Sequence, residues 1–194
     1  IAIHPGGDLF VADTGNHRVR RISRGGIVTT FAGTGLPGMA ADAGPATLAQ
    51  LNEPRGLAFD GAGNLYIADT GNNRIRRVDA TGFLGTVSAP ELLAPQAVVS
   101  TIDGSLLVAD TGKHRIVHLD GGAATIAAGT GEPGFGGDGG YGTGAQFQFP
   151  VALAIDGNGN IAIADRGNGR IRLLRPEAAL ISVDRKSTRL NSSH

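Results

Sequence analysis

One stretch of sequence decides the fold: LYIADTGNNRIRRV, which begins at Leu65. Three more copies read LFVADTGNHRVRRI from Leu9, LLVADTGKHRIVHL from Leu106 and IAIADRGNGRIRLL from Ile161. A motif that recurs along a chain marks one structural unit per copy, and such units bury their apolar faces against one another. The chain is therefore predicted to be a repeat protein with four modules.

Two repeat lengths alternate. The copies are 56, 41 and 55 residues apart, as measured between their aspartates, Asp13, Asp69, Asp110 and Asp165. Both long intervals contain a second repeated element, which begins with GTGLPG or GTGEPG and covers residues 33–54 and 129–150. This pattern indicates a module of about 40 residues with an insertion in the first and third copies. The modules are predicted to span residues 1–54, 55–94, 95–149 and 150–175.

Each module has the pattern of several short strands. Alternating apolar residues on both sides of the turn at residues 60–64 are typical of a β-hairpin, and a third strand is expected over residues 74–78. A weaker fourth strand is expected near residues 27–31 and 124–127. Three to four strands per module, without an amphipathic helix, predict an all-β propeller in which each module is one blade.

The composition fits a folded protein rich in turns. Glycine accounts for 32 of the 194 residues, and 41% of the residues are hydrophobic, which suffices to build a core. One segment, residues 45–51, could form a helical turn, whereas its counterpart at residues 141–147 contains two glycines and is expected to be a loop. The sequence contains no cysteine, which excludes disulfides and thiolate metal sites. No stretch approaches the ~18 apolar residues of a membrane span.

Every copy of the motif contains an aspartate, a glycine two residues later and an arginine five residues later. The carboxylate is expected to accept N–H groups of the following turn, the glycine to supply a positive φ, and the arginine to pair with the aspartate. A catalytic residue rarely appears in every copy of a repeat, so these residues are predicted to be structural. They are Asp13, Gly15, Arg18, Asp69, Gly71, Arg74, Asp110, Gly112, Arg115, Asp165, Gly167 and Arg170.

With these residues the chain resembles the NHL-repeat family of β-propellers. The resemblance covers residues 1–175 and rests on four copies of the signature in register, joined by glycine-rich segments like those of bacterial proteins with many NHL repeats. It implies a ring, commonly of six blades, so the four modules are expected to be an incomplete arc. It also implies that the protein is exported or lies at the cell surface.

Several local patterns imitate known sites. Residues 156–160 resemble the start of a calcium loop, but glycine replaces the acid needed at the twelfth position, so a hairpin turn is expected. Residues 134–140 could cradle a phosphate, but no P-loop lysine follows, and a loop between blades is expected. His17 and His114 are interpreted as solvated turn residues, and His4 as an exposed strand end. The sequence therefore assigns no catalytic residue, no cofactor and no metal ligand.

Arginines are enriched in three of the four modules. Some NHL domains bind RNA through a basic face, which makes RNA binding one alternative function. The zero formal net charge, two tyrosines and lack of tryptophan disfavour a nucleic-acid partner. The arginines are instead expected to pack their stems between blades with their heads in solvent. They are Arg18, Arg20, Arg21, Arg24, Arg74, Arg76, Arg77, Arg170, Arg172 and Arg175.

The sequence thus predicts a non-catalytic binding, scaffold or sensor module. Its partner, a protein or a small molecule, is expected to bind rim loops within residues 33–54 and 129–150, since propeller function lies in loops that differ between blades. The first alternative to this function is a propeller lyase or hydrolase whose metal site lies in blades outside this sequence, and RNA binding is the second.

Two expectations concern the ends of the repeat region. An open arc leaves apolar strand surface uncovered, so Ile1, Ile3, Ile161 and Ile163, or their neighbours, are expected to be exposed. The repeat pattern stops after residue 175. Residues 176–194 are interpreted as a tail outside the repeat, with residues 184–194 typical of disorder or of a translated adapter.

Overall fold

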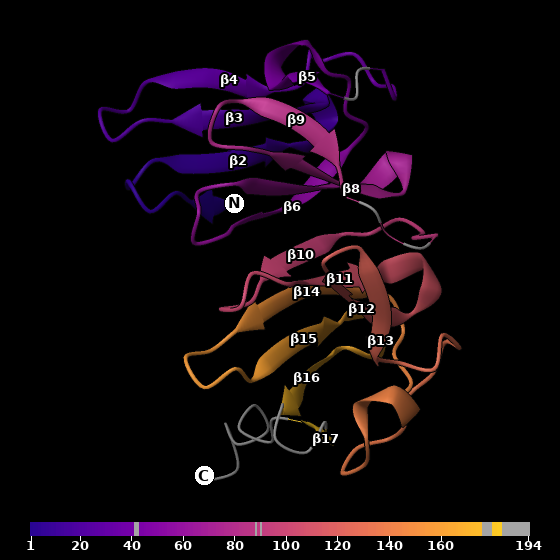
Figure 1. The fold of residues 1–194 in the computed structure, drawn as a ribbon. Helices are drawn as coiled ribbons and strands as arrows, with labels where there is room; N and C mark the ends of the chain where they lie inside the picture. Colours follow the sequence, from indigo (N-terminus) through magenta and orange to yellow (C-terminus); the bar gives the residue numbers. More distant parts are fainter. Residues whose placement is uncertain (41–42, 88, 90, 176–179, 184–194) are drawn as a thin grey trace, which may run out of the picture.

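The computed structural model describes residues 1–40, 43–87, 89, 91–175 and 180–183. They form four antiparallel sheets in chain order, with the first at the top of Figure 1 and the fourth at the bottom. Each sheet is one blade, so the predicted all-β propeller is confirmed. In the described part of the chain the only helical segments are 3₁₀ turns, and no helix is long and apolar enough to cross a membrane.

The four blades share one strand order. The first contains β1 (Ala2–Ile3), β2 (Leu9–Asp13), β3 (Arg18–Ile22) and β4 (Val28–Ala32). The second contains β6 (Pro54–Phe59), β7 (Leu65–Asp69), β8 (Arg74–Val78) and β9 (Phe83–Thr86), with β5 (Gly44–Pro45) added at the edge beside β9. The third contains β10 (Ala97–Ser100), β11 (Leu106–Asp110), β12 (Arg115–Asp120) and β13 (Ala123–Ala128). The fourth contains β14 (Pro150–Ile155), β15 (Ile161–Asp165), β16 (Arg170–Arg175) and β17 (Leu180–Val183), which continues the sheet past residue 175.

A single side chain organises the hairpin turn between the first two strands of a blade. In the second blade the N–H groups of Ala62 and Asn64 donate to Asp60 Oδ1 at 3.0 and 2.8 Å. Asp156 holds the turn at residues 156–160 in the same way, so the calcium-like segment is a hairpin turn. In the first blade His4 takes this place, because the Gly6 N–H donates to its Nδ1 at 2.9 Å.

The core lies between the blades. One apolar cluster, which includes Phe10 and Ile67, joins the first and second blades. A second, around Ile75 and Val108, joins the second and third blades, and a third, around Phe147, joins the third and fourth. A fully buried side chain of this size contributes about 1.5–3 kcal/mol, so a blade is stabilised mainly by its neighbours.

The two ends of the arc are uncovered to different degrees. Ile1 and Ile3 are 80% and 67% exposed, as expected for an open first blade. Ile161 and Ile163 are buried, and the expectation that they are exposed is wrong. Side chains alternate across a strand, and these two face the third blade, where they join its core cluster. An apolar residue of the fourth blade that is exposed is Ile171, on β16.

The segments that join successive blades, residues 33–53, 87–96 and 129–149, are here named connectors. The two long connectors each contain a 3₁₀ turn, at Ala46–Leu48 and at Gly142–Gly144. The expectation of a loop without helical structure at residues 141–147 is therefore wrong. Glycine does not prevent a single tight turn when hydrogen bonds fix that turn to the blade. Here the Gly129 N–H donates to Gly142 O at 2.9 Å.

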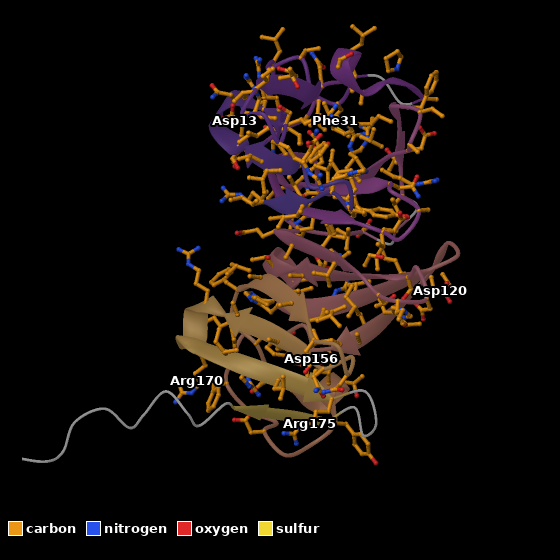
Figure 2. The ribbon with its side chains drawn as sticks, turned by 90° about the vertical axis from the view of Figure 1, so that its left-hand side faces the viewer. Asp13, Phe31, Asp120, Asp156, Arg170 and Arg175 are labelled. Atoms are coloured by element: carbon orange, nitrogen blue, oxygen red, sulfur yellow. The ribbon has the colours of Figure 1, made fainter. Side chains whose placement is uncertain are left out.

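The blades present two rims. The turns that follow the signature aspartates lie on one, the signature rim, and the hairpin turns such as residues 60–64 lie on the other, the hairpin rim. Figure 2 shows Asp13 and Arg170 of the signature rim on the left, on the first and fourth blades, and Asp120 of the hairpin rim on the right. The connectors start and end on the signature rim.

The hairpin turns should make stability depend on pH below 4. Asp103 accepts hydrogen bonds from Thr101 Oγ1 and from the Ser105 N–H, and these lower its pKa from 3.8 to about 2. Because the pKa of this carboxyl is lower in the folded state, its ionised form stabilises the fold at any pH above the pKa of the unfolded chain. This contribution is lost as the pH falls from about 4 towards 2. Urea denaturation at pH 7, 4 and 2.5 should show a smaller loss for Asp103→Asn than for the wild type. Equal losses would contradict this role.

Candidate functional site

The signature aspartate holds the connector that enters its own blade. Asp69 is fully buried, and the Asn52 N–H donates to its Oδ1 at 2.7 Å. Asn72 Nδ2 and Arg74 Nε donate to its Oδ2 at 2.8 and 2.9 Å. The expectation that the carboxylate caps N–H groups of its own turn is wrong, because the buried oxygen faces the incoming backbone instead.

The same bond recurs at the other junctions. The Leu93 N–H donates to Asp110 Oδ1, and the Gln148 N–H to Asp165 Oδ1, each at 2.7 Å. Both carboxylates are fully buried. A buried carboxylate is costly unless it is hydrogen-bonded, so each connector both satisfies the charge and is fixed by it.

In the second, third and fourth blades the signature glycine is required by close packing rather than by a positive φ. The φ of +57° lies two residues after Gly71, at Asn73, so the expectation of a positive φ at this glycine is wrong. The Gly71 N–H donates to Asn52 O at 2.9 Å, and a Cβ on Gly112 would lie 2.8 Å from Leu93 O. The glycine therefore lets the connector backbone pass against the turn.

Two further residues of the signature turn hold the connector that leaves the blade. Thr70 Oγ1 donates to Pro95 O at 2.7 Å, and Asn73 Oδ1 accepts the Ala94 N–H at 2.7 Å. His17 Nδ1 accepts the Glu53 N–H at 3.1 Å in the first blade, so this histidine is not only a solvated turn residue. The sequence signal for this role is that histidine recurs at the same motif position, as His114, in the third copy.

The third blade repeats this arrangement. Thr111 Oγ1 donates to Pro150 O at 2.5 Å, and His114 Nδ1 accepts the Phe149 N–H at 3.1 Å. Each described junction is thus built from two copies of the motif. The copy before the junction supplies a hydroxyl and a ring or amide acceptor, and the copy after it supplies the carboxylate and the glycine.

The expected pairing of aspartate with arginine occurs in two of the four copies. Arg74 and Arg115 each donate to their aspartate, at 2.9 and 2.8 Å. Arg18 and Arg170 instead donate to backbone carbonyls, Asn16 O and Asn168 O. The four turns therefore share a backbone path without sharing every side-chain contact.

In the fourth blade another arginine binds the aspartate. Arg172 is fully buried, which contradicts the expectation of solvated heads. Its Nε donates to Asp138 Oδ1 at 2.9 Å, its Nη1 reaches Asp165 Oδ2 at 3.3 Å, and its Nη2 donates to Gly136 O at 2.9 Å. The glycine-rich segment at residues 134–140 thus surrounds a guanidinium and joins a connector to a blade.

A cleft opens on the hairpin rim between the first and second blades. It has a volume of about 410 Å³ and is lined by four rings in contact, His4, Phe10, Phe31 and Phe59. The rings meet edge to face, with 4.9 Å between the centroids of Phe10 and Phe59 and 5.0 Å between those of His4 and Phe59. His4 and Phe10 belong to one hairpin, but Phe31 and Phe59 lie on β4 and β6, far from that hairpin in sequence, so no local motif could indicate the cleft.

Charged groups edge the same cleft. Arg21 Nε donates to Asp8 Oδ2 at 2.6 Å, and this hydrogen bond is the largest cause of a lowered Asp8 pKa. Hydrogen bonds from Thr81 lower the pKa of Asp79, which also lines the cleft. Both carboxylates therefore stay ionised at lower pH than an unpaired aspartate, and they lie beside the aromatic rings of the cleft. Among the described residues, no group of three or more His, Cys, Asp or Glu side chains is arranged to hold a metal ion.

Comparisons with known proteins agree with the repeat. The family model of the NHL repeat matches residues 1–22, 51–78 and 147–172. A stretch of 74 residues is 39% identical to Protein SUPPRESSOR OF QUENCHING 1, chloroplastic, of Arabidopsis thaliana, and it covers 38% of this chain and 7% of that protein.

Solved propellers share the fold at low identity. A catalytically inactive virginiamycin B lyase from Staphylococcus aureus with quinupristin has a TM-score of 0.65 and 17% identity, over 96% of this chain and 55% of that one. An auxiliary nutrient binding protein from Bacteroides ovatus has a TM-score of 0.66 and 19% identity, over 93% and 45%. The chain spans about half the length of these structures.

Removing the signature carboxylate should destabilise its junction. Asp69→Ala deprives the Asn52 N–H and Arg74 of their shared acceptor, and we expect a loss of ~1–3 kcal/mol in the free energy of unfolding. Urea denaturation measures it, with Asp120→Ala, a change at the exposed end of β12, as a control. An unchanged midpoint for Asp69→Ala would contradict a structural role.

The signature glycines should differ in their tolerance of a side chain. Gly167→Ala places a Cβ 2.6 Å from Gln148 O, whereas a Cβ on Gly15 meets no atom within 4 Å. We expect Gly167→Ala to cost about 1–3 kcal/mol and Gly15→Ala to be neutral within about 0.5 kcal/mol. Thermal and urea unfolding of both variants check this contrast. Equal destabilisation would show that backbone conformation, rather than the connector, selects the glycine.

Proposed function

We propose, from the premise that the chain is built of NHL repeats, that it is a non-catalytic binding module for a small molecule. The ligand would bind the cleft between the first and second blades on the hairpin rim. The observation that carries this proposal is the four-ring lining of the cleft, edged by charged groups. Ligand sites are typically ~300–1,000 Å³ and combine apolar walls with a few convergent polar groups.

The polar groups indicate the class of ligand. His4 Nδ1 already accepts the Gly6 N–H, so in the neutral ring Nε2 carries the hydrogen and is a donor. Arg21 supplies further donors beside Asp8, and Asp79 supplies a negative charge. The cleft therefore suits a small amphipathic molecule with one apolar ring face and polar groups at its edge.

The long connectors are a weaker choice for the ligand site than the sequence suggested. Their backbone and side chains are used to join blades, as at Arg172 with Asp138 and Gly136. A larger cleft, of about 490 Å³, lies between the second and third blades. Its lining also carries charged groups, Arg77, Asp79 and Asp120. It contains two aromatic rings, those of Tyr66 and Phe83, whereas the cleft between the first and second blades contains four.

The two alternative functions stay predictions. The structural likeness to virginiamycin B lyase is the observation that keeps a lyase in view, and at 17% identity it concerns the fold alone. RNA binding would require free arginine heads. Arg76 and Arg172 are buried, and Arg74 and Arg115 pair with aspartates, so this surface is less basic than the sequence suggested.

Ligand-observed NMR with a panel of small aromatic and sugar compounds tests the binding proposal. Compounds that bind the wild type should bind at least about tenfold more weakly to Phe31→Leu and Arg21→Gln. Phe135→Leu is the matched control, since Phe135 lies on a connector away from the cleft. Binding that is equal in all variants, or no binding in the panel, would overturn the assignment. Stoichiometric metal in the purified protein would favour the lyase or hydrolase instead.

A further inference from the structure

The first blade has the two signature residues, Asp13 and Gly15, that in the other blades contact the entering connector. In the second, third and fourth blades the signature aspartate accepts a connector N–H, and each aspartate is fully buried. Asp13 is only partly buried, and its Oδ1 accepts from Asn16 Nδ2 at 2.8 Å. The space beside Gly15 is open, where the other three signature glycines touch connector atoms.

An arginine on β3 is a second, independent sign. Seven residues after the signature aspartate stand Arg20, Arg76, Val117 and Arg172. The two blades that follow a long connector have an arginine there, and the blade that follows the short connector has valine. In the fourth blade this arginine binds the aspartate of the glycine-rich segment, Asp138. Arg20 Nε is buried and has no hydrogen-bond partner among the described residues.

The fourth blade differs from the other three in the residues that would hold a connector leaving the blade. Where the other copies have a threonine that donates to the next proline carbonyl, this blade has Arg166. Where they have a histidine or asparagine that accepts the next connector N–H, it has Gly169. The first blade therefore has the residues that hold an entering connector. In the fourth blade, the residues that hold a leaving connector are replaced.

We propose that the edge of the first blade binds a further connector of the long, glycine-rich kind, which leads directly into β1 from another blade. Its backbone N–H would donate to Asp13 Oδ1 and its carbonyl would accept the Gly15 N–H. An aspartate twelve residues before its proline, the spacing of Asp138 and Pro150, would bind Arg20. A short connector would leave the Arg20 guanidinium without a carboxylate, which disfavours it.

A graft supplies this connector. His4 and Asp156 occupy equivalent turn positions, so residue 153 corresponds to residue 1, and a second copy of residues 129–152 is fused directly ahead of Ile1. We expect the fusion to raise the thermal midpoint by about 3 °C or more. In the fusion, Arg20→Val and Asp138→Asn in the added copy should each remove most of this gain.

Controls separate docking from nonspecific stabilisation. Gly15→Ala should not change the chain without the graft, because its Cβ meets open space, but it should block the gain in the fusion. A fusion that carries residues 86–97, the short connector, should give a smaller gain than the long one. No gain from the long connector, or a gain that survives both Arg20→Val and Gly15→Ala, would overturn the proposal.

A second copy of the protein is the competing occupant. Light scattering of the unfused chain over a range of concentrations measures it. A dimer that Arg20→Val or Gly15→Ala dissociates would show that this edge serves self-association, and would also overturn the proposal. A monomer, together with the graft result above, supports it.

Discussion

Asp69, Asp110 and Asp165 lie fully buried at the ends of their strands, and each accepts a backbone N–H from the connector that enters its blade. A carboxylate in this position cannot be left without partners, because an unpaired buried charge costs several kcal/mol. The connector must therefore pass close to the turn. This close passage requires glycine two residues after each aspartate. It also fixes the point at which the connector enters the first strand of that blade.

Because each junction uses parts of two successive copies, no blade completes its own hydrogen bonds. Thr70 and Asn73 of the second blade hold the chain that enters the third, while Asp110 and Gly112 hold the same chain from the other side. The apolar clusters obey the same logic, since all three lie between blades. Stability in such an array is a sum of interface contributions, so an uncovered edge is the weakest part.

The division of the blades into two rims separates structural chemistry from the proposed binding chemistry. On the signature rim the polar groups of the connectors join blades, and even the guanidinium of Arg172 is enclosed. On the hairpin rim the turns close on themselves through residues such as Asp60 and His4, which leaves the cleft between the first two blades accessible. This separation is the reason why we propose the ligand site on the hairpin rim, although the sequence pointed to the long connectors.

The sequence by itself determined the repeat, the strands and the turns, because these follow from local periodicity and from glycine and aspartate at regular positions. The third strand expected at residues 74–78 is β8, and the hairpin at residues 60–64 is present. Only the tertiary structure decided what the motif residues bind. The partners of Asp69, Thr70 and His17 lie 17, 25 and 36 residues away. Likewise, Ile163 faces the third blade rather than solvent, because the alternation of a strand gives two faces and only packing selects the buried one.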